Sequence, residues 1–149
     1  MPAPRAEAPV DPPPAQLAAV VGVESQLVER WARIWGSDDG LTYWVLPQLR
    51  CGVVTENDRA CVAVAAEFVE GAACAAETDI AQRGVSDWYP IGGRPVLAGF
   101  APRGATTARV SVPGYEQQLF PVRDGVFAGT LPEDVRMDRP DAYNLTFIR

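Results

Sequence analysis

The sequence lacks two of the side chains that enzymes most often use. It contains no histidine, and all 13 of its basic residues are arginine, so lysine is absent as well. Histidine-based acid–base catalysis, Ser-His and Cys-His nucleophiles, Schiff-base chemistry and Walker-type phosphate binding are therefore excluded. Carboxylate chemistry and the recognition of anions by arginine remain open to this chain.

A pair of carboxylates is the general acid–base device that this composition retains. A glycosidase-like pair needs two carboxyl groups about 5 to 10 Å apart, and nothing in the sequence brings two of them to that separation. The residues that could contribute are Asp38, Asp39, Glu56, Asp58 and Asp87. A small carboxylate-dependent enzyme is kept as an alternative, and no catalytic residue is assigned.

Aromatic residues and one arginine are the candidate binding residues, because exposed aromatic side chains are the usual anchors of recognition. They are Trp31, Trp35, Trp88, Tyr89 and Arg94. Trp88 and Tyr89 precede a Gly-Gly pair, which predicts an aromatic and an arginine on a flexible loop; the alternative is a loop that caps the core. Trp31 and Trp35 could form a ligand platform, or could be two rings of a helix that packs on a sheet.

The three cysteines offer two interpretations. Cys51, Cys61 and Cys74 form no CxxC motif and have no histidine nearby, so neither zinc nor another cofactor is expected. They are either buried free thiols, or one disulfide and an odd cysteine. Cys61 and Cys74 are the favoured pair, since they bracket what could be a hairpin and closing that loop would add about 3 kcal/mol. Such a bond requires an oxidising compartment.

Charge and hydropathy restrict the partners. The net charge of −6 and the sequence pI near 4.6 argue against binding nucleic acid through a basic surface. A membrane helix needs about 20 apolar residues, and the best candidate, Leu17–Val23, is far shorter. The expected partner is therefore another protein.

The chain divides into a tether and one domain. Residues 1–14 hold six prolines and predict a disordered tether, which would suit an anchor or leader further upstream. Residues 15–149 predict a single β-rich domain. Ala15–Trp35 predicts one amphipathic helix, although Gly22 could divide it in two. Ala75–Arg83, which Gly84 ends, predicts a second and shorter helix.

The rest of the domain predicts strands, and therefore a mainly β (α+β) fold, an antiparallel β-sandwich or meander. Phe100–Leu131 predicts three consecutive strands of one meander, in which Asp124-Gly125 forms a type I′ hairpin turn. Arg59–Glu70 could be a strand or a helix, and the strand is favoured. Further strands are expected at Leu41–Leu46, Gln48–Thr55, Val85–Pro90, Pro95–Ala101 and Ala142–Arg149, with turns at Ser37–Gly40 and Glu56–Asp58 and an acidic loop at Glu133–Asp141.

Four stretches carry a resemblance to a known kind of module: Cys61–Cys74, Ala75–Gly84, Gly99–Gly104 and Pro121–Phe127. Together they resemble a β-rich module of uncharacterised envelope-associated or secreted proteins of high-GC Gram-positive bacteria. The similarity covers Cys61–Pro132, a little under half of the chain, and its motifs are structural turns. It implies a fold and an extracytoplasmic location, but no catalytic residue and no activity.

Three functions follow from these observations. The leading expectation is a non-enzymatic extracytoplasmic domain that binds or interacts with a protein. The first alternative is a structural or assembly subunit that forms oligomers through the edges of its sheets. The second alternative is the carboxylate-dependent enzyme.

Overall fold

The computed structural model describes residues 14–22, 24–46, 59–135 and 142–149. Residues 1–13 of the predicted tether, the strand at Gln48–Thr55, the turn that follows it and Cys51 lie outside these residues, whereas Pro14, the last residue of the predicted tether, begins α1. The elements within them are α1 (Pro14–Val21), α2 (Ser25–Trp31), β1 (Arg33–Asp38), β2 (Leu41–Leu46), β3 (Arg59–Ala65), β4 (Val69–Ala76), α3 (Glu77–Arg83), β5 (Val85–Ile91), β6 (Arg94–Phe100), β7 (Thr107–Ser111), β8 (Gln118–Pro121), β9 (Val126–Thr130) and β10 (Asn144–Ile148).

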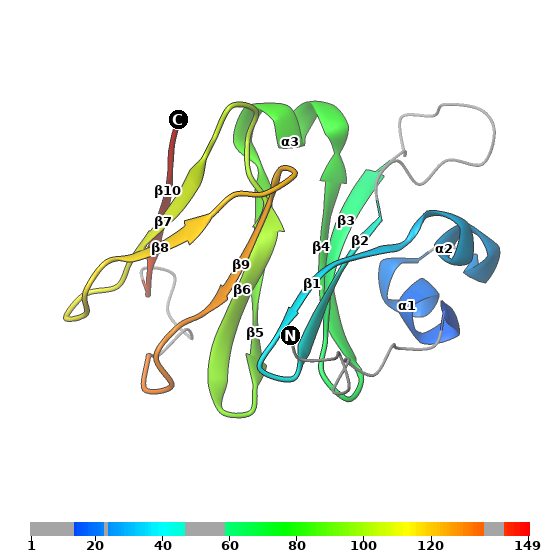
Figure 1. Ribbon diagram of the computed structural model, residues 1–149, viewed down its shortest axis with the longest axis horizontal. Coiled ribbons are helices and arrows are strands. Elements are labelled where there is room, and N and C mark those ends of the chain that lie inside the picture. Colours follow the sequence, from blue (N-terminus) through cyan, green and yellow to red (C-terminus); the bar gives the residue numbers. More distant parts are fainter. Residues whose placement is uncertain (1–13, 23, 47–58, 136–141) are drawn as a thin grey trace, which may run out of the picture.

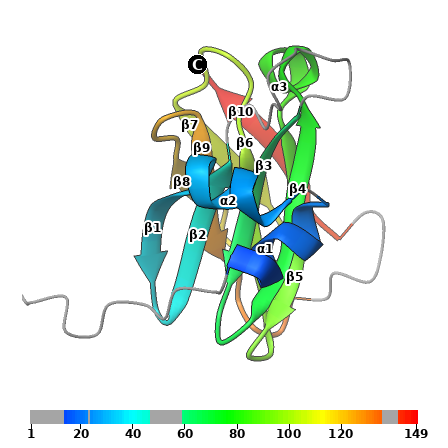
Figure 2. The same cartoon turned by 90° about the vertical axis from the view of Figure 1, so that its right-hand side faces the viewer.

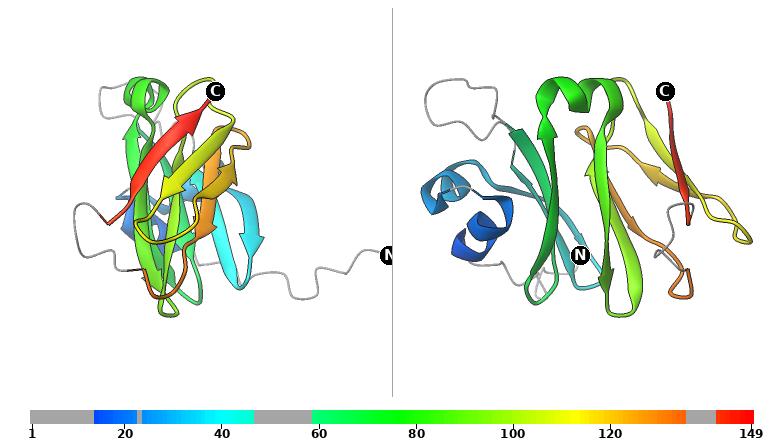
Figure 3. Two further views of the ribbon diagram at one scale, coloured as in Figure 1. Left: turned by 90° about the vertical axis from the view of Figure 1, so that its left-hand side faces the viewer. Right: turned by 180° about the vertical axis from the view of Figure 1, so that it is seen from behind.

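The elements stack in four layers (Figure 1). Helices α1 and α2 cover a first sheet of order β1-β2-β3-β4, which packs on a middle sheet of order β5-β6-β9. An outer sheet of order β10-β7-β8 covers the other face of the middle sheet. Seen from behind, α3 joins the first sheet to the middle sheet at one end (Figure 3). All strand pairs are antiparallel, and the predicted mainly β fold class is confirmed.

The middle sheet is buried on both faces, and β6 shows how the sequence achieves this. Val96, Ala98 and Phe100 pack toward the first sheet, whereas Leu97 packs toward the outer sheet. Successive side chains of a strand point to opposite faces, so a strand between two layers needs apolar residues at nearly every position. The sequence RPVLAGF meets this need, and residues 95–100 are all buried.

The first sheet is covered on its other face by α1 and α2, which lie across it (Figure 2). Gly22 has a φ of +77°, in the left-handed region that glycine adopts readily, and α1 ends there. The single helix predicted over Ala15–Trp35 is therefore wrong, since Gly22 divides it. Residues Arg33–Trp35 are also not helical, because this stretch, which contains an aromatic and a β-branched residue, belongs to β1, in which Arg33 and Ile34 pair with β2.

The predicted three-stranded meander is correct for its first two strands and for its hairpin turn, but its third strand joins another sheet. Asp124 and Gly125 have φ values of +55° and +77°, as a type I′ turn requires. However, β8 pairs with β7 in the outer sheet, while β9 pairs with β6 in the middle sheet. Beside the turn, Arg123 and Val126 form a single isolated bridge. Pro121 has no N–H with which to extend this bridge into a ladder, and the chain changes sheets at the turn.

Two other boundaries differ from the prediction for local reasons. Asp39 and Gly40 form the β1–β2 turn with φ values of +52° and +80°, whereas Ser37 and Asp38 still pair with β2. Helix α3 begins at Glu77 rather than Ala75, because Ala75 and Ala76 pair with β3. The strand favoured over a helix for the start of Arg59–Glu70 is confirmed as β3.

Candidate functional site

Trp88 and Tyr89 lie within β5 and not on the loop that the sequence suggested. Trp88 packs on the core toward the outer sheet. Tyr89 points the opposite way, toward the first sheet, where only 8% of the residue is exposed. Burial, and secondarily Asp87, raises the pKa of Tyr89, so the phenol is neutral. These two rings are on opposite faces of the middle sheet and cannot form one binding platform.

Arg94 lies at the start of β6, beside the β5–β6 turn. Its Nη2 atom donates to Asp39 Oδ2 over 2.6 Å, and this hydrogen bond and ion pair raise the pKa of Arg94. The pair connects the β1–β2 turn to the β5–β6 hairpin. Arg94 also lines a shallow hollow of about 500 Å³, whose other walls include Glu133 and Asp134.

The carboxylates proposed for catalysis are exposed where the structure describes them. Asp38 and Asp39 belong to the β1–β2 hairpin, and Asp87 accepts a hydrogen bond of 2.8 Å from the backbone N–H of Trp88. Glu56 and Asp58 lie outside the described residues. Within residues 14–22, 24–46, 59–135 and 142–149, no three carboxylates or cysteines are close enough together to hold a metal ion.

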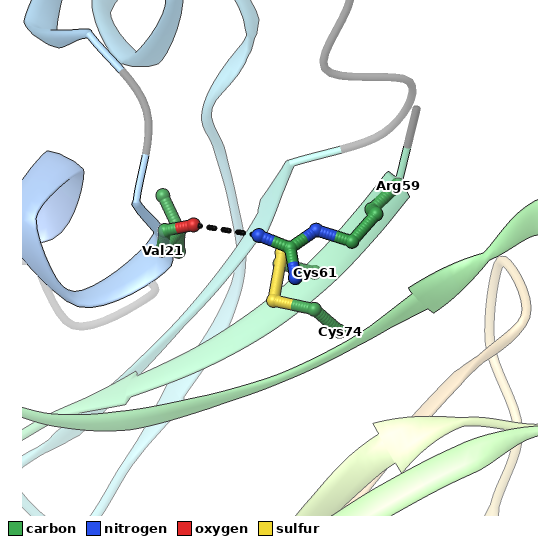
Figure 4. The surroundings of a disulfide bond; sticks show 4 residues. All are labelled: Val21, Arg59, Cys61 and Cys74. Atoms are coloured by element: carbon green, nitrogen blue, oxygen red, sulfur yellow. Dashed lines mark hydrogen bonds between the residues drawn. A yellow bond between two sulfur atoms is a disulfide. The ribbon is translucent and has the colours of Figure 1, made fainter. Parts of the chain in front are cut away.

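Cys61 and Cys74 face each other across the β3–β4 ladder, with their sulfur atoms 2.09 Å apart (Figure 4). The predicted pair is thus at disulfide distance. Cys61 is fully buried beneath the two helices, among residues of the cluster that joins them to the first sheet. Beside it, Arg59 Nη2 donates to the carbonyl oxygen of Val21 over 3.2 Å, at the end of α1. The bond therefore joins two strands that hold the helical layer.

A smaller hollow of about 200 Å³, here called the Trp35 groove, lies between the edge of the first sheet and the turn before β9. Its floor is apolar, and its rim carries three charged side chains and the exposed side chain of Ile34. It is lined by Arg33, Ile34, Trp35, Val45, Arg123, Asp124 and Val126. Among the described strands β1 pairs only with β2, so the groove runs along a sheet edge.

Trp35 and Arg123 hold each other in place in this groove. The indole Nε1 atom donates to the Arg123 carbonyl oxygen over 2.8 Å, and Arg123 Nη2 donates to the Trp35 carbonyl oxygen over 2.6 Å. The guanidinium also lies 4.4 Å above the centre of the Trp35 ring, within cation–π distance. Tyr43 packs edge-on against the same ring, 5.9 Å between centres. Both groups are therefore fixed before any ligand binds.

The described part of the chain offsets the positive charge of the groove only in part, through Asp124 among its lining residues. Arg33 Nη1 donates to the carbonyl oxygens of Arg30 and Ala32, and Arg123 donates to that of Trp35. Within the described residues neither guanidinium forms an ion pair with a carboxylate. Carbonyl oxygens orient a guanidinium but leave its full charge, so the groove is electropositive on a protein of net charge −6.

The predicted site residues are thus not brought together. Trp35 lines the groove, whereas Arg94 lines the other hollow and Trp31 lies at the end of α2, 37% exposed, with the Arg30 guanidinium 5.8 Å from its ring centre. Arg123 could not be identified as a site residue from the sequence. Its separation of 88 residues from Trp35 leaves no local signal.

Comparison with known proteins adds no relative: no family model, no curated protein and no solved structure matches this chain. The resemblance to envelope-associated modules therefore stays an expectation. Among the helices that the structure describes, none is long and apolar enough to span a bilayer.

Proposed function

We propose that this chain is a non-enzymatic domain that binds a protein partner outside the cytoplasm, and that the Trp35 groove is its binding site. The observation that carries the proposal is the pair of oriented guanidinium groups of Arg33 and Arg123, which have no carboxylate partner among the described residues and lie beside an apolar floor. Surface arginines without such a role are free to rotate in water; these two are held beside a hollow.

The size and composition of the groove favour a protein ligand. Small-molecule sites usually exceed about 300 Å³, and the groove of about 200 Å³ accommodates about one amino-acid side chain. Tryptophan and arginine are the residues that most often dominate the energy of protein interfaces. Ile34, at the rim, is 46% exposed and would be covered by a partner.

The location is supported by the disulfide pair. A disulfide that joins Cys61 to Cys74 persists in an oxidising compartment and is rare in a cytoplasm kept reduced by thiols. The resemblance of Cys61–Pro132 to envelope-associated modules points the same way. A count of free thiols on protein taken from its natural compartment tests this part: three free thiols contradict it.

A selection from a library of random peptides tests the binding site. Peptides enriched on the wild-type protein are expected to bind Ile34→Glu at least about 10-fold more weakly, because the new carboxylate would neutralise the groove and remove its apolar rim. Leu119→Glu is the matched control, since Leu119 is 56% exposed but lies on β8 of the outer sheet. Peptides that bind Ile34→Glu as well as the wild type, or no enrichment at all, would contradict the proposal.

A second candidate, assembly through a sheet edge, is favoured by β10. This strand, NLTFI, is an edge of the outer sheet and carries no charge, whereas β1 is protected by a bulge at Trp35 and by the Arg123 side chain. Antiparallel pairing of two β10 strands would make a dimer. Light scattering should then show a concentration-dependent dimer that Ile148→Lys abolishes; a monomer at all concentrations would eliminate this candidate.

A further inference from the structure

We propose that the Trp35 groove takes the C-terminal residue of a peptide chain: its α-carboxylate lies between Arg33 and Arg123, and its apolar side chain enters the groove. This inference rests on the proposed function and names the chemistry of the partner. Three observations lead to it: the charge of the rim, the nature of the floor and the blocked edge of β1.

The rim matches a single carboxylate. Arg33 and Arg123 contribute two positive charges and Asp124 one negative charge, which leaves a local charge of +1 among the lining residues. A carboxylate carries one negative charge, whereas a phosphate group carries nearly two. Each guanidinium has five N–H donors and uses one nitrogen for backbone carbonyls, so donors remain for charge-assisted hydrogen bonds to a ligand.

The floor matches one apolar side chain. Ile34, Val45 and Val126 line the groove together with the ring of Trp35, and none of them presents a polar side-chain atom that lacks a partner there. The indole N–H is already bonded to Arg123. A polar side chain packed against these apolar groups would lose hydrogen bonds to water and gain none from them, whereas an apolar one would gain burial.

The edge of β1 explains why the ligand should be a chain end. A peptide could pair with an exposed edge strand, but the pairing register of β1 shifts between Ile34 and Gly36. The Trp35 carbonyl oxygen, within this irregular stretch, is already bonded to Arg123. A ladder could therefore not continue past Trp35. A peptide that reaches the groove must end there or turn away. A peptide that ends there would place its terminal carboxylate beside the two arginines.

Labelled pentapeptides Gly-Ser-Gly-Ser-X, each as a free acid and as a C-terminal amide, test this inference by fluorescence anisotropy. We expect the acids with X as Leu or Phe to bind at least about 10-fold more tightly than their amides, and than the acid with X as Ser. Arg33→Gln and Arg123→Gln should each remove most of the acid–amide difference. Arg83→Gln is the matched control, because Arg83 is an exposed arginine of α3 that pairs with Asp79.

The outcomes separate the two proposals. Equal binding of acid and amide that Ile34→Glu abolishes overturns the C-terminal inference but leaves the groove as the site. If an amidated peptide with an internal Asp or Glu binds as tightly as the free acids, the C-terminal inference is overturned in the same way. Failure of all acids to bind also overturns it, while the library selection decides the proposed function independently. Arg123→Gln also removes a contact with Trp35, so the thermal unfolding of this variant is measured as a control. Arg33→Gln gives an independent measurement of the acid–amide difference.

Discussion

The pair of cysteines gives the most quantitative prediction about stability. Cys61 and Cys74 are directly opposite in the β3–β4 ladder and are separated by 13 residues. Replacing both by alanine, or reducing the bond, releases this loop in the unfolded chain. Both changes should therefore lower the free energy of unfolding.

The magnitude follows from the loop length. A cross-link that closes a loop of this size removes unfolded-state entropy worth about 3 kcal/mol at 25 °C. For a domain of this length, that loss should lower the melting temperature by about 10 °C. The double alanine variant should lose somewhat more, since Cys61 is fully buried and its sulfur also contributes to packing under α1 and α2.

Urea unfolding at pH 7, with and without a phosphine reductant, measures the effect. The reductant should destabilise the wild type by about 3 kcal/mol and leave Cys61→Ala/Cys74→Ala unchanged. The reduced wild type retains both sulfur atoms, so this comparison isolates the cross-link from the packing. If a thiol assay shows complete reduction while the wild-type unfolding curve does not move, the reasoning is refuted.

Two further predictions concern packing and pH. A Cβ at Gly129 would overlap the ring of Phe120, so Gly129→Ala should lower the free energy of unfolding by about 1 to 3 kcal/mol. The loss should be smaller in a Phe120→Leu background. Equal losses in both backgrounds, measured by urea unfolding, would contradict this contact. Burial, and then Asp38 and Asp39, raise the pKa of Tyr43 from 10.0 to about 12. Because the folded state favours the neutral phenol, Tyr43 should contribute roughly 2 to 3 kcal/mol to the free energy of unfolding below pH 10, and this contribution should be lost as the pH rises through 12. Tyr43→Phe should not show this loss. Parallel profiles of stability against pH for the two proteins would argue against the prediction.

Local turn chemistry made much of the fold predictable. Asp124-Gly125 adopts positive φ as expected, and a turn is present at Asp39-Gly40, within the predicted turn Ser37–Gly40. Asp and Gly tolerate this region of φ better than other residues. Alternation of apolar residues located β7 and β10, and the aromatic and β-branched residues of Leu41–Leu46 located β2. Gly22 was recognised as a weak point of the first helix, and it is where α1 ends.

Which strands pair with each other could not be predicted from turn residues or from apolar patterns. Alternation tells which residues of a strand face a core, but not which of two sheets the strand joins. The Asp124-Gly125 turn therefore suggested a continued hairpin, although β9 pairs with β6. A physical hint was present in Pro121, which interrupts a ladder, and in the continuous apolar run of β6, which is typical of a strand covered on both faces.

The candidate site was predictable only in part. Trp35 was named from its residue type, but its partner Arg123 comes from a distant turn that only the stacking of the sheets brings close. Trp88 and Tyr89 were placed on a loop because the Gly92-Gly93 turn follows them. The strand extends to Ile91, however, and the middle sheet is covered on both sides, so Tyr89 is buried and Trp88 is half-buried against the core.

The most direct test of the binding site is nuclear magnetic resonance mapping on the ¹⁵N-labelled chain. A peptide recovered by the library selection is titrated into the protein, and the shifts of backbone amides and of the Trp35 indole N–H are followed. The account predicts that the largest changes fall on Arg33–Trp35 and Arg123–Val126, including the indole signal. Changes confined to the outer sheet or to the hollow beside Arg94, with Trp35 unmoved, would contradict it.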